Sequence, residues 1–134
     1  MTILYVETSA ILRLLFQETG HEDTAKRLES ADRLIVSRLL KVEVERAIIR
    51  AAKMQGQKRE AIANSLQAYF RTLWAKFDCV EISREICDLA GQFAPDANLR
   101  SLDAVHAATF HWLKIRVPEA KFLSYDQRLI NLGF

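Results

Sequence analysis

Two of the acidic residues come at most two positions after short apolar runs that are too brief for helices. Glu7 follows Thr2–Val6, and Asp126 stands two residues after the run Lys121–Ser124. Such runs are typical of buried strands in a parallel sheet, and ligands bind outside the carboxyl ends of those strands. Each carboxylate could therefore face a ligand, or could interact with the N-terminus of the helix that follows it.

A third acidic residue, Glu43, lies in a predicted helix. It borders an apolar stripe that includes Leu40 and Ala47, so its carboxylate needs a partner, because a half-buried unpaired charge is costly. That partner could be Arg46 or Arg50. A metal ion or a catalytic water would satisfy the same carboxylate.

A fourth acidic residue, Asp103, stands in the first turn of Leu102–Phe110, a segment that is apolar nearly all round and predicts a buried helix. The amide groups and the dipole of a first turn favour a negative charge, which is one explanation of Asp103. His106 lies one turn further along and could hydrogen-bond Asp103. We therefore expect His106 to support a site rather than to bind a ligand itself.

If these elements form as predicted, Glu7, Glu43, Asp103 and Asp126 converge at one edge of the sheet. Carboxylates gathered closely repel one another and do not all ionise alone. A divalent cation balances their charge, and oxygen-only ligands select a hard ion such as Mg²⁺ or Mn²⁺. Such an ion can bind a phosphate oxygen and lower the pKa of a bound water, so the residues predict phosphodiester hydrolysis. No nucleophile–His–acid triad, Gly-rich phosphate loop or H-E-x-x-H motif competes with this interpretation.

Positive charge is concentrated in one segment. Arg38–Arg59 holds seven Lys or Arg and two Glu, whereas the net charge of the whole chain is +2. Arg46, Arg50 and Lys53 lie on the outward side of the predicted helix and could follow an RNA phosphate backbone. A solvated helix face is the alternative explanation of the same pattern.

Short strands alternating with helices predict an α/β fold with a short central parallel sheet flanked by helices. Thr8, Ser83 and Ser101 are the expected helix caps. The expected strands are Thr2–Val6, Arg33–Ser37, Cys79–Ile82 and Lys121–Ser124, and the expected helices are Thr8–Leu15, Glu22–Glu29, Leu39–Met54, a continuation from Gly56 to Lys76, Ser83–Phe93, Ser101–Lys114 and a last one from Asp126.

The composition predicts one packed globular domain over residues 1–134, because 50% of the residues are hydrophobic and 27% are charged. Disordered and fibrous classes are excluded by the same figures. Cys79 and Cys87 form neither a Cys-x-x-Cys pair nor a zinc-finger spacing, so we expect reduced thiols in a cytoplasmic protein. The longest apolar run, Ile3–Val6, is far shorter than the roughly 20 residues of a membrane span, and no membrane association is expected.

Four segments resemble the successive motifs of PIN-domain ribonucleases, and within that family the VapC toxins of bacterial and archaeal toxin–antitoxin systems. Any one of these motifs would be unspecific, but four in the family's order and spacing, from the first strand to the last helix, are specific. The segments are Tyr5–Ile11, Ser37–Glu43, Leu99–His106 and Ser124–Leu129.

The resemblance implies a PIN-like fold and a Mg²⁺-dependent endoribonuclease, the toxin of a VapBC-type system, acting on RNA such as tRNA or rRNA. It also implies a homodimer and a cognate antitoxin protein that blocks the site. The resemblance implies four catalytic acids, which are Glu7, Glu43, Asp103 and Asp126. Three of them, Glu7, Asp103 and Asp126, are the implied metal ligands. The implied supporting residues are Thr8, Ser9 and His106.

Glu7 departs from the family, which has Asp at this position. The extra methylene displaces the carboxylate, and a misplacement of about 1 Å can cost about a hundredfold in rate. The alternative hypothesis is therefore a catalytically weakened PIN-fold module that binds RNA or an antitoxin. A phosphate-transferring receiver or phosphatase is a third hypothesis, but the sequence Ile82–Glu85 after the third strand offers no phosphoacceptor Asp.

Overall fold

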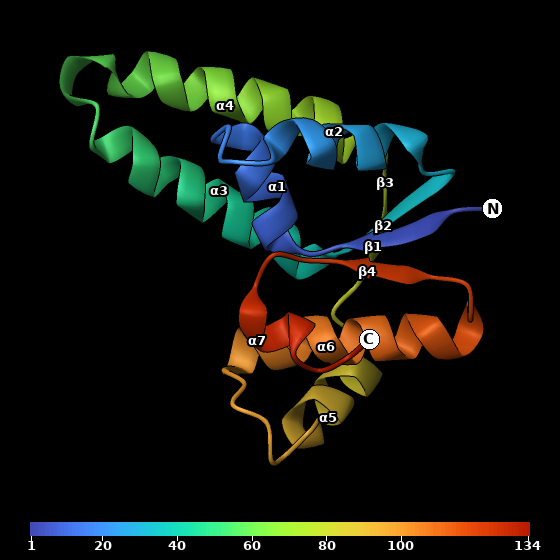
Figure 1. Cartoon of the computed structure of the whole chain (residues 1–134). Coiled ribbons are helices and arrows are strands. Elements are labelled where there is room, and N and C mark those ends of the chain that lie inside the picture. The colour runs from blue at the N-terminus through green and yellow to red at the C-terminus, as the bar shows by residue number, and fades with distance from the viewer.

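The computed structural model describes residues 1–134 and has an α/β architecture built on four parallel strands (Figure 1). The strands lie in the order β3-β2-β1-β4, so β1 occupies the middle of the sheet beside β2. The predicted fold class, a short parallel sheet flanked by helices, is confirmed. The strands are β1 (Ile3–Val6), β2 (Arg33–Ser37), β3 (Phe77–Val80) and β4 (Lys121–Leu123).

Helices cover both faces of the sheet. In Figure 1, α1 to α4 lie above the sheet, and α5, α6 and α7 lie below it. The helices are α1 (Thr8–Leu15), α2 (His21–Ser30), α3 (Arg38–Lys53), a short 3-10 turn η1 (Gly56–Lys58), α4 (Arg59–Trp74), α5 (Arg84–Gln92), α6 (Ser101–Arg116) and α7 (Gln127–Ile130).

The alternation of side chains along β1 divides the core into two parts. Leu4 and Val6 pack with the helices of the first layer, in a cluster that includes residues of α1, α2, α3 and α4. Ile3 and Tyr5 point to the other face and pack against Phe110 of α6. Because both faces are covered, the strand is apolar throughout and shows no alternation of polar residues.

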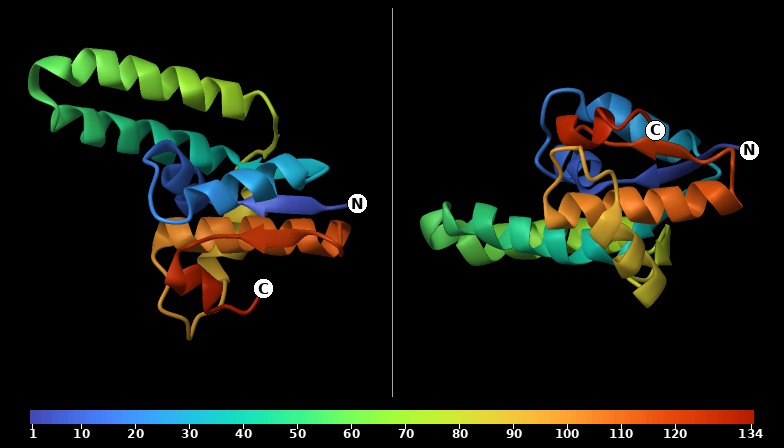
Figure 2. Two further views of the ribbon diagram at one scale, coloured as in Figure 1. Left: turned by 45° about the horizontal axis from the view of Figure 1, so that its top comes forward. Right: turned by 90° about the horizontal axis from the view of Figure 1, so that it is seen from below.

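The helices α3 and α4 form a long antiparallel hairpin that extends beyond the sheet (Figure 2). The predicted break at Gly56 is the turn of this hairpin, where the backbone has a φ of 59° that favours glycine. The base of α3 remains close to the sheet, because α3 begins directly after β2. Residues in the first turns of α3 therefore lie beside the carboxyl ends of the strands.

The structure corrects two details of the predicted elements. The third strand is Phe77–Val80, two residues earlier than expected, because its pairing with β2 runs from Leu34 to Ser37. Ser83 caps α5 as predicted, but Thr8 and Ser101 are the first residues of their helices rather than the caps. The residues at the N-cap positions of α1 and α6 are Glu7 and Arg100.

Candidate active site

Glu7 and Ser124 leave the sheet side by side. Val6 of β1 pairs with Leu123 of β4, and the Glu7 amide donates to the Leu123 carbonyl at 3.0 Å. This pairing places the Ser124 hydroxyl 2.6 Å from Glu7 Oε1, to which it donates. The Glu7 side chain is therefore held at the carboxyl end of the two adjacent strands, where its residue is 5% exposed.

Two serines connect Glu7 to the loop that carries Asp126. The Ser9 hydroxyl donates to the same Glu7 oxygen at 2.5 Å and accepts from the Tyr125 amide at 2.8 Å. Ser124 accepts from the Asp126 amide at 3.0 Å. Asp126 caps α7, as one of the two sequence interpretations had it, with Oδ1 accepting from a backbone amide of the helix. Ser9, which the resemblance names as a supporting residue, is thus brought next to Glu7.

Glu43 lies in a second group of polar side chains, formed by Thr8, His106 and Tyr5. Glu43 Oε1 accepts from the Thr8 hydroxyl at 2.6 Å and lies 2.6 Å from His106 Nε2. The other ring nitrogen, His106 Nδ1, lies 2.8 Å from the Tyr5 hydroxyl. The ion-pair partner expected from the sequence is corrected here, because Glu43 pairs with His106 and with neither Arg46 nor Arg50.

The geometry of this group defines which atoms donate. An ionised carboxylate only accepts, so His106 Nε2–H donates to Glu43. When the ring is neutral, Nδ1 then accepts the hydroxyl proton of Tyr5, and when the ring is protonated, Nδ1–H donates to the Tyr5 oxygen. Tyr5 and His106 are 0% and 1% exposed, so neither group exchanges these partners for water. Tyr5 therefore fixes the tautomer with which His106 holds Glu43.

The surroundings shift the pKa of two members of this group. Burial raises the pKa of Glu43, but three effects outweigh it and leave that pKa below its ordinary value: the hydrogen bond from His106, the charge of this ring when protonated, and the hydrogen bond from Thr8. Burial raises the pKa of Tyr5 well above its ordinary value, and the negative charges of Glu7 and Glu43 raise it further. Glu43 therefore stays ionised, and Tyr5 keeps its proton, near neutral pH.

Asp103 lies in the first turn of α6 and is 6% exposed. Its Oδ2 accepts from the Arg100 amide at 3.1 Å and lies 3.4 Å from the guanidinium Nε of the same residue. The hydrogen bond to His106 that the sequence suggested does not form, because both His106 nitrogens bond partners from β1 and α3. Asp103 is close enough to Glu43 for its charge to oppose the lowering of that pKa.

The four predicted acids share one feature. Each accepts hydrogen bonds through a single carboxylate oxygen, and the second oxygen has no protein donor: these second oxygens are Oε2 of Glu7, Oε2 of Glu43, Oδ1 of Asp103 and Oδ2 of Asp126. Hard oxygen donors of this kind fit Mg²⁺ or Mn²⁺. However, no group of three or more His, Cys, Asp or Glu side chains is gathered closely enough to hold a metal ion. The side chains are distributed among separate hydrogen-bonded groups instead of the single cluster expected.

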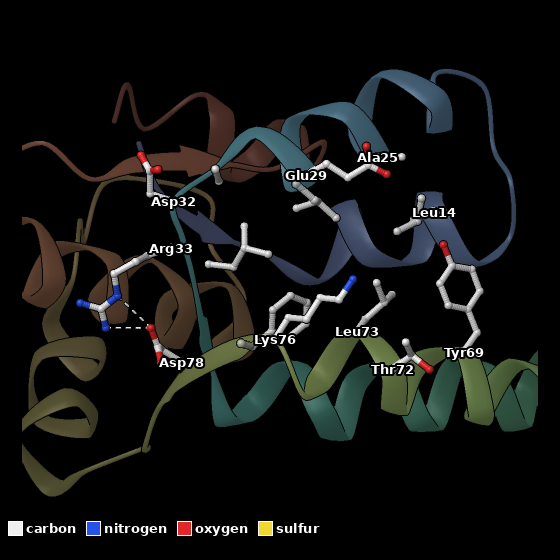
Figure 3. A pocket seen from close by; sticks show the side chains of 14 residues that line it. Leu14, Ala25, Glu29, Asp32, Arg33, Tyr69, Thr72, Leu73, Lys76 and Asp78 are labelled. Carbon is white, nitrogen blue, oxygen red and sulfur yellow. Dashed lines mark hydrogen bonds and ion pairs between the residues drawn. The ribbon is translucent and has the colours of Figure 1, made fainter. Parts of the chain in front are cut away.

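The remaining predicted residues form no ion pair with these acids. Arg46, Arg50 and Lys53 are exposed on α3, and none of them forms an ion pair. A cavity of about 490 Å³ lies at the opposite edge of the sheet, where β2 and β3 begin (Figure 3). The Arg33–Asp78 ion pair crosses its wall, and none of the four acids lines it.

The structure adds residues to which the sequence analysis gave no role. Ser124 orients Glu7, and Tyr5 orients His106. Ser124 offered a signal, because it is a hydroxyl residue at the predicted end of a strand, as is Glu7. Tyr5 offered none, because an aromatic residue inside a buried strand is expected to pack and not to donate a functional hydrogen bond.

Comparisons with known proteins place this architecture in a family. The family model described as "PIN domain" matches residues 4–134. Ribonuclease VapC35 of Mycobacterium tuberculosis is 34% identical over 129 residues, which cover 95% of this chain and 87% of that protein.

Two solved structures share the fold. The crystal structure of VapC20 of Mycobacterium tuberculosis, described as a sarcin–ricin loop cleaving toxin, has a TM-score of 0.72 at 15% identity and covers 98% of this chain and 95% of that one. VapBC2 of Rickettsia felis, bound to a DNA fragment from the promoter, has a TM-score of 0.63 at 10% identity and covers 93% of this chain and 100% of that one.

The fold is that of a PIN domain. The chain belongs to the PIN domain family and, within it, to the ribonuclease VapC proteins. PIN-domain ribonucleases use divalent metal ions. No helix in the structure combines the length and the apolarity needed to cross a membrane.

Proposed function

We propose that this protein is a Mg²⁺-dependent endoribonuclease that hydrolyses phosphodiester bonds of RNA as the cytoplasmic toxin of a VapBC-type system. One observation carries the proposal: Glu7, Asp103 and Asp126 stand at the carboxyl edge of the sheet, each with one carboxylate oxygen that no protein donor satisfies. These three residues are the ligands that the resemblance to PIN-domain ribonucleases implies, and they would have to move together from their separate hydrogen-bonded groups to hold the ion. When bound, a divalent cation neutralises phosphate charge and lowers the pKa of a coordinated water.

The hydrogen-bonded groups supply the orientation that this chemistry requires. Ser9 and Ser124 hold the Glu7 carboxylate through its Oε1, and leave Oε2 to face the ligand. Thr8 and His106 hold Glu43 in the same way. Because the pKa of Glu43 is lowered, its carboxylate is ionised near neutral pH and can accept a proton from an attacking water.

The proposed partners follow from the surface and from the neighbours in fold. Arg46, Arg50 and Lys53 are exposed on one helix and would contact the phosphates of an RNA such as tRNA or rRNA. The Rickettsia felis neighbour is a VapBC complex, which supports a cognate antitoxin protein as the partner that blocks the site. A homodimer is part of the same proposal.

The test is cleavage of a folded RNA by antitoxin-free protein in Mg²⁺, in Mn²⁺ and in EDTA. We expect cleavage in both metals and none in EDTA. In Asp103→Asn the side chain keeps its shape but lacks its charge, so the cleavage rate should fall ~100-fold, as it does when one electrostatic contact at a reacting centre is lost. Cleavage by Asp103→Asn at the unaltered rate, with its fold checked by circular dichroism, would remove Asp103 from the mechanism.

A second function, a binding module without turnover, is favoured by the identity of residue 7. The Glu7 side chain is one methylene longer than Asp, and two hydroxyls hold its carboxylate. The variant Glu7→Asp separates the two functions. Cleavage that appears only in Glu7→Asp would identify the natural chain as a weakened enzyme that binds RNA or antitoxin. Metal-dependent cleavage by the unaltered chain would establish Glu7 as a working ligand.

A further inference from the structure

Arg13 of α1 is packed tightly although its charge has no partner. Its guanidinium carbon lies 3.6 Å from the centre of the Tyr125 ring. Tyr125 is itself fixed, because its hydroxyl hydrogen-bonds Thr24 at 2.8 Å and its amide donates to Ser9. On another side the guanidinium packs against Gly20, where an added Cβ would lie 3.3 Å from Arg13 Nη1.

The guanidinium of Arg13 lacks an acceptor within the protein. Its Nε is the only buried side-chain nitrogen or oxygen without a hydrogen-bond partner. The two terminal nitrogens donate to no protein acceptor and are not closed off from solvent, and Arg13 takes part in none of the ion pairs. A guanidinium is always charged, so half-burying it without an anion is unfavourable. The buried Nε is out of reach of an outside ligand, but the two terminal nitrogens remain open to an anion that comes from outside the chain.

The position of Arg13 connects it to the proposed active site. Arg13 follows Ser9 by four residues, so both project from the same face of α1, about 5–6 Å apart at their Cβ atoms. Ser9 donates directly to the Glu7 carboxylate at 2.5 Å. The aromatic support of Arg13, Tyr125, is the residue before Asp126. An anion on Arg13 would therefore lie beside Tyr125, next to the loop that carries Asp126.

We infer that Arg13 binds a phosphodiester group of the RNA that neighbours the one to be cleaved. The inference rests on the proposed function, because that function places an RNA strand at the acids. A guanidinium donates two parallel hydrogen bonds to a phosphate, and the Tyr125 ring beneath it fixes its plane. Every nucleotide carries the same phosphate, so Arg13 contributes affinity and register and not the choice of sequence.

The first test is RNA binding without cleavage. A fluorescent single-stranded oligoribonucleotide is titrated in EDTA at several salt concentrations, and its anisotropy is followed. We expect Arg13→Gln to weaken binding ~10-fold, as the loss of one charge-assisted contact does. The slope of log K against log salt should fall by about 0.7, the contribution of one phosphate contact on a single strand. The matched control is Arg33→Gln, which removes an arginine paired with Asp78 at the opposite edge of the sheet and should leave the slope unchanged.

The second test separates a ligand-binding arginine from a structural one. In Arg13→Met the side chain still packs on Tyr125 but carries no unpaired charge, so its Tm should equal or exceed that of the unaltered protein, while RNA binding is lost as in Arg13→Gln. A structural arginine would instead give a lower Tm with unchanged binding. In the cleavage assay Arg13→Gln should raise KM and leave kcat near its original value.

The outcomes distinguish this inference from the proposed function. If the unaltered chain cleaves RNA and Arg13→Gln keeps its affinity and salt slope, the inference is wrong and the function stands. If binding depends on Arg13 but no metal supports cleavage, the function is wrong and the inference stands. If Arg13→Gln impairs binding of an acidic protein partner and leaves RNA binding unchanged, Arg13 serves a carboxylate and the inference is again overturned.

Discussion

The Tyr5 hydroxyl offers the sharpest test of the buried hydrogen-bonded group. The change Tyr5→Phe removes a single oxygen, which lies 2.8 Å from His106 Nδ1. The ring itself stays packed, because it stacks on Phe122 with centroids 5.6 Å apart and planes 10° from parallel. The substitution removes the hydrogen bond between Tyr5 and His106, both at most 1% exposed, together with the contributions that Thr109 and Ser37 make to the same hydroxyl.

The expected cost follows from the group that is left behind. Without the hydroxyl, His106 Nδ1 is a buried acceptor with no partner, and such groups cost about 1–3 kcal/mol. An unfolding entropy of about 2.1 cal/mol/K per residue, over the 134 residues of the chain, is about 0.28 kcal/mol/K. The Tm of Tyr5→Phe should therefore fall by about 4–11 °C.

The measurement is thermal unfolding followed by circular dichroism, with Tyr69→Phe as the matched control. Tyr69 is 44% exposed and its hydroxyl makes no hydrogen bond within the protein, so its removal should change the Tm by less than about 2 °C. A Tyr5→Phe protein that melts within 2 °C of Tyr69→Phe would refute the assignment of Tyr5 as the partner that fixes His106 (about 2 °C corresponds to ~0.5 kcal/mol).

Three further predictions concern the same two groups of polar residues. Because the pKa of Glu43 is lower in the folded chain, the ionised carboxylate stabilises the fold above the unfolded pKa of about 4.3, and this stabilisation is lost as pH falls through the folded pKa. In urea unfolding, Glu43→Gln should therefore lose less stability on acidification than the unaltered chain. An equal loss in both proteins would contradict this prediction. Because the pKa of Tyr5 is raised in the folded chain, the contribution of the protonated phenol to stability is complete below pH about 10 and is lost as pH rises toward the folded pKa. Tyr5→Phe should not show this alkaline loss of stability. A loss equal to that of the unaltered chain would contradict the prediction. Ser124→Ala removes one of the two donors to the Glu7 carboxylate, so unfolding should become easier by about 1.5–3 kcal/mol, and no change in the unfolding midpoint would show that the bond at 2.6 Å contributes nothing.

The fold could be predicted because its signals are local. Four short apolar runs separated by helical patterns define a parallel sheet, and the order of the runs is visible in the sequence. The errors lie at element ends, where pairing with a neighbour decides the boundary. The third strand is displaced by two residues because its partner, β2, ends at Ser37 and extends the pairing only to Val80.

The site could be predicted in part. The acids that follow strands were found because the carboxyl ends of parallel strands meet at one edge, which needs no knowledge of side-chain contacts. The predicted partner of His106 was wrong. Helical spacing favours Asp103 as its neighbour, whereas the actual partners come from β1 and α3. The three residues Glu43, His106 and Tyr5 are distant in sequence, and only the folded chain brings them together.

Arg13 illustrates a feature that no pattern reveals. In the sequence it is the one charged residue of α1, and such a residue is expected to be solvated. Its burial against Tyr125 and the absence of an acceptor for its Nε are properties of the packing alone. A half-buried guanidinium without an acceptor therefore carries information about ligands that the sequence does not hold.

We propose that a divalent cation draws together Glu7, Asp103 and Asp126, which lie in separate hydrogen-bonded groups in this structure, and this can be tested without knowing the RNA target. The most direct measurement is an amide NMR spectrum of the protein with substoichiometric Mn²⁺, which broadens the signals of residues near the bound ion. We predict broadening at these three residues, its loss in Asp103→Asn, and none at Arg33 on the opposite edge of the sheet. Broadening centred elsewhere, or unchanged in Asp103→Asn, would contradict the account.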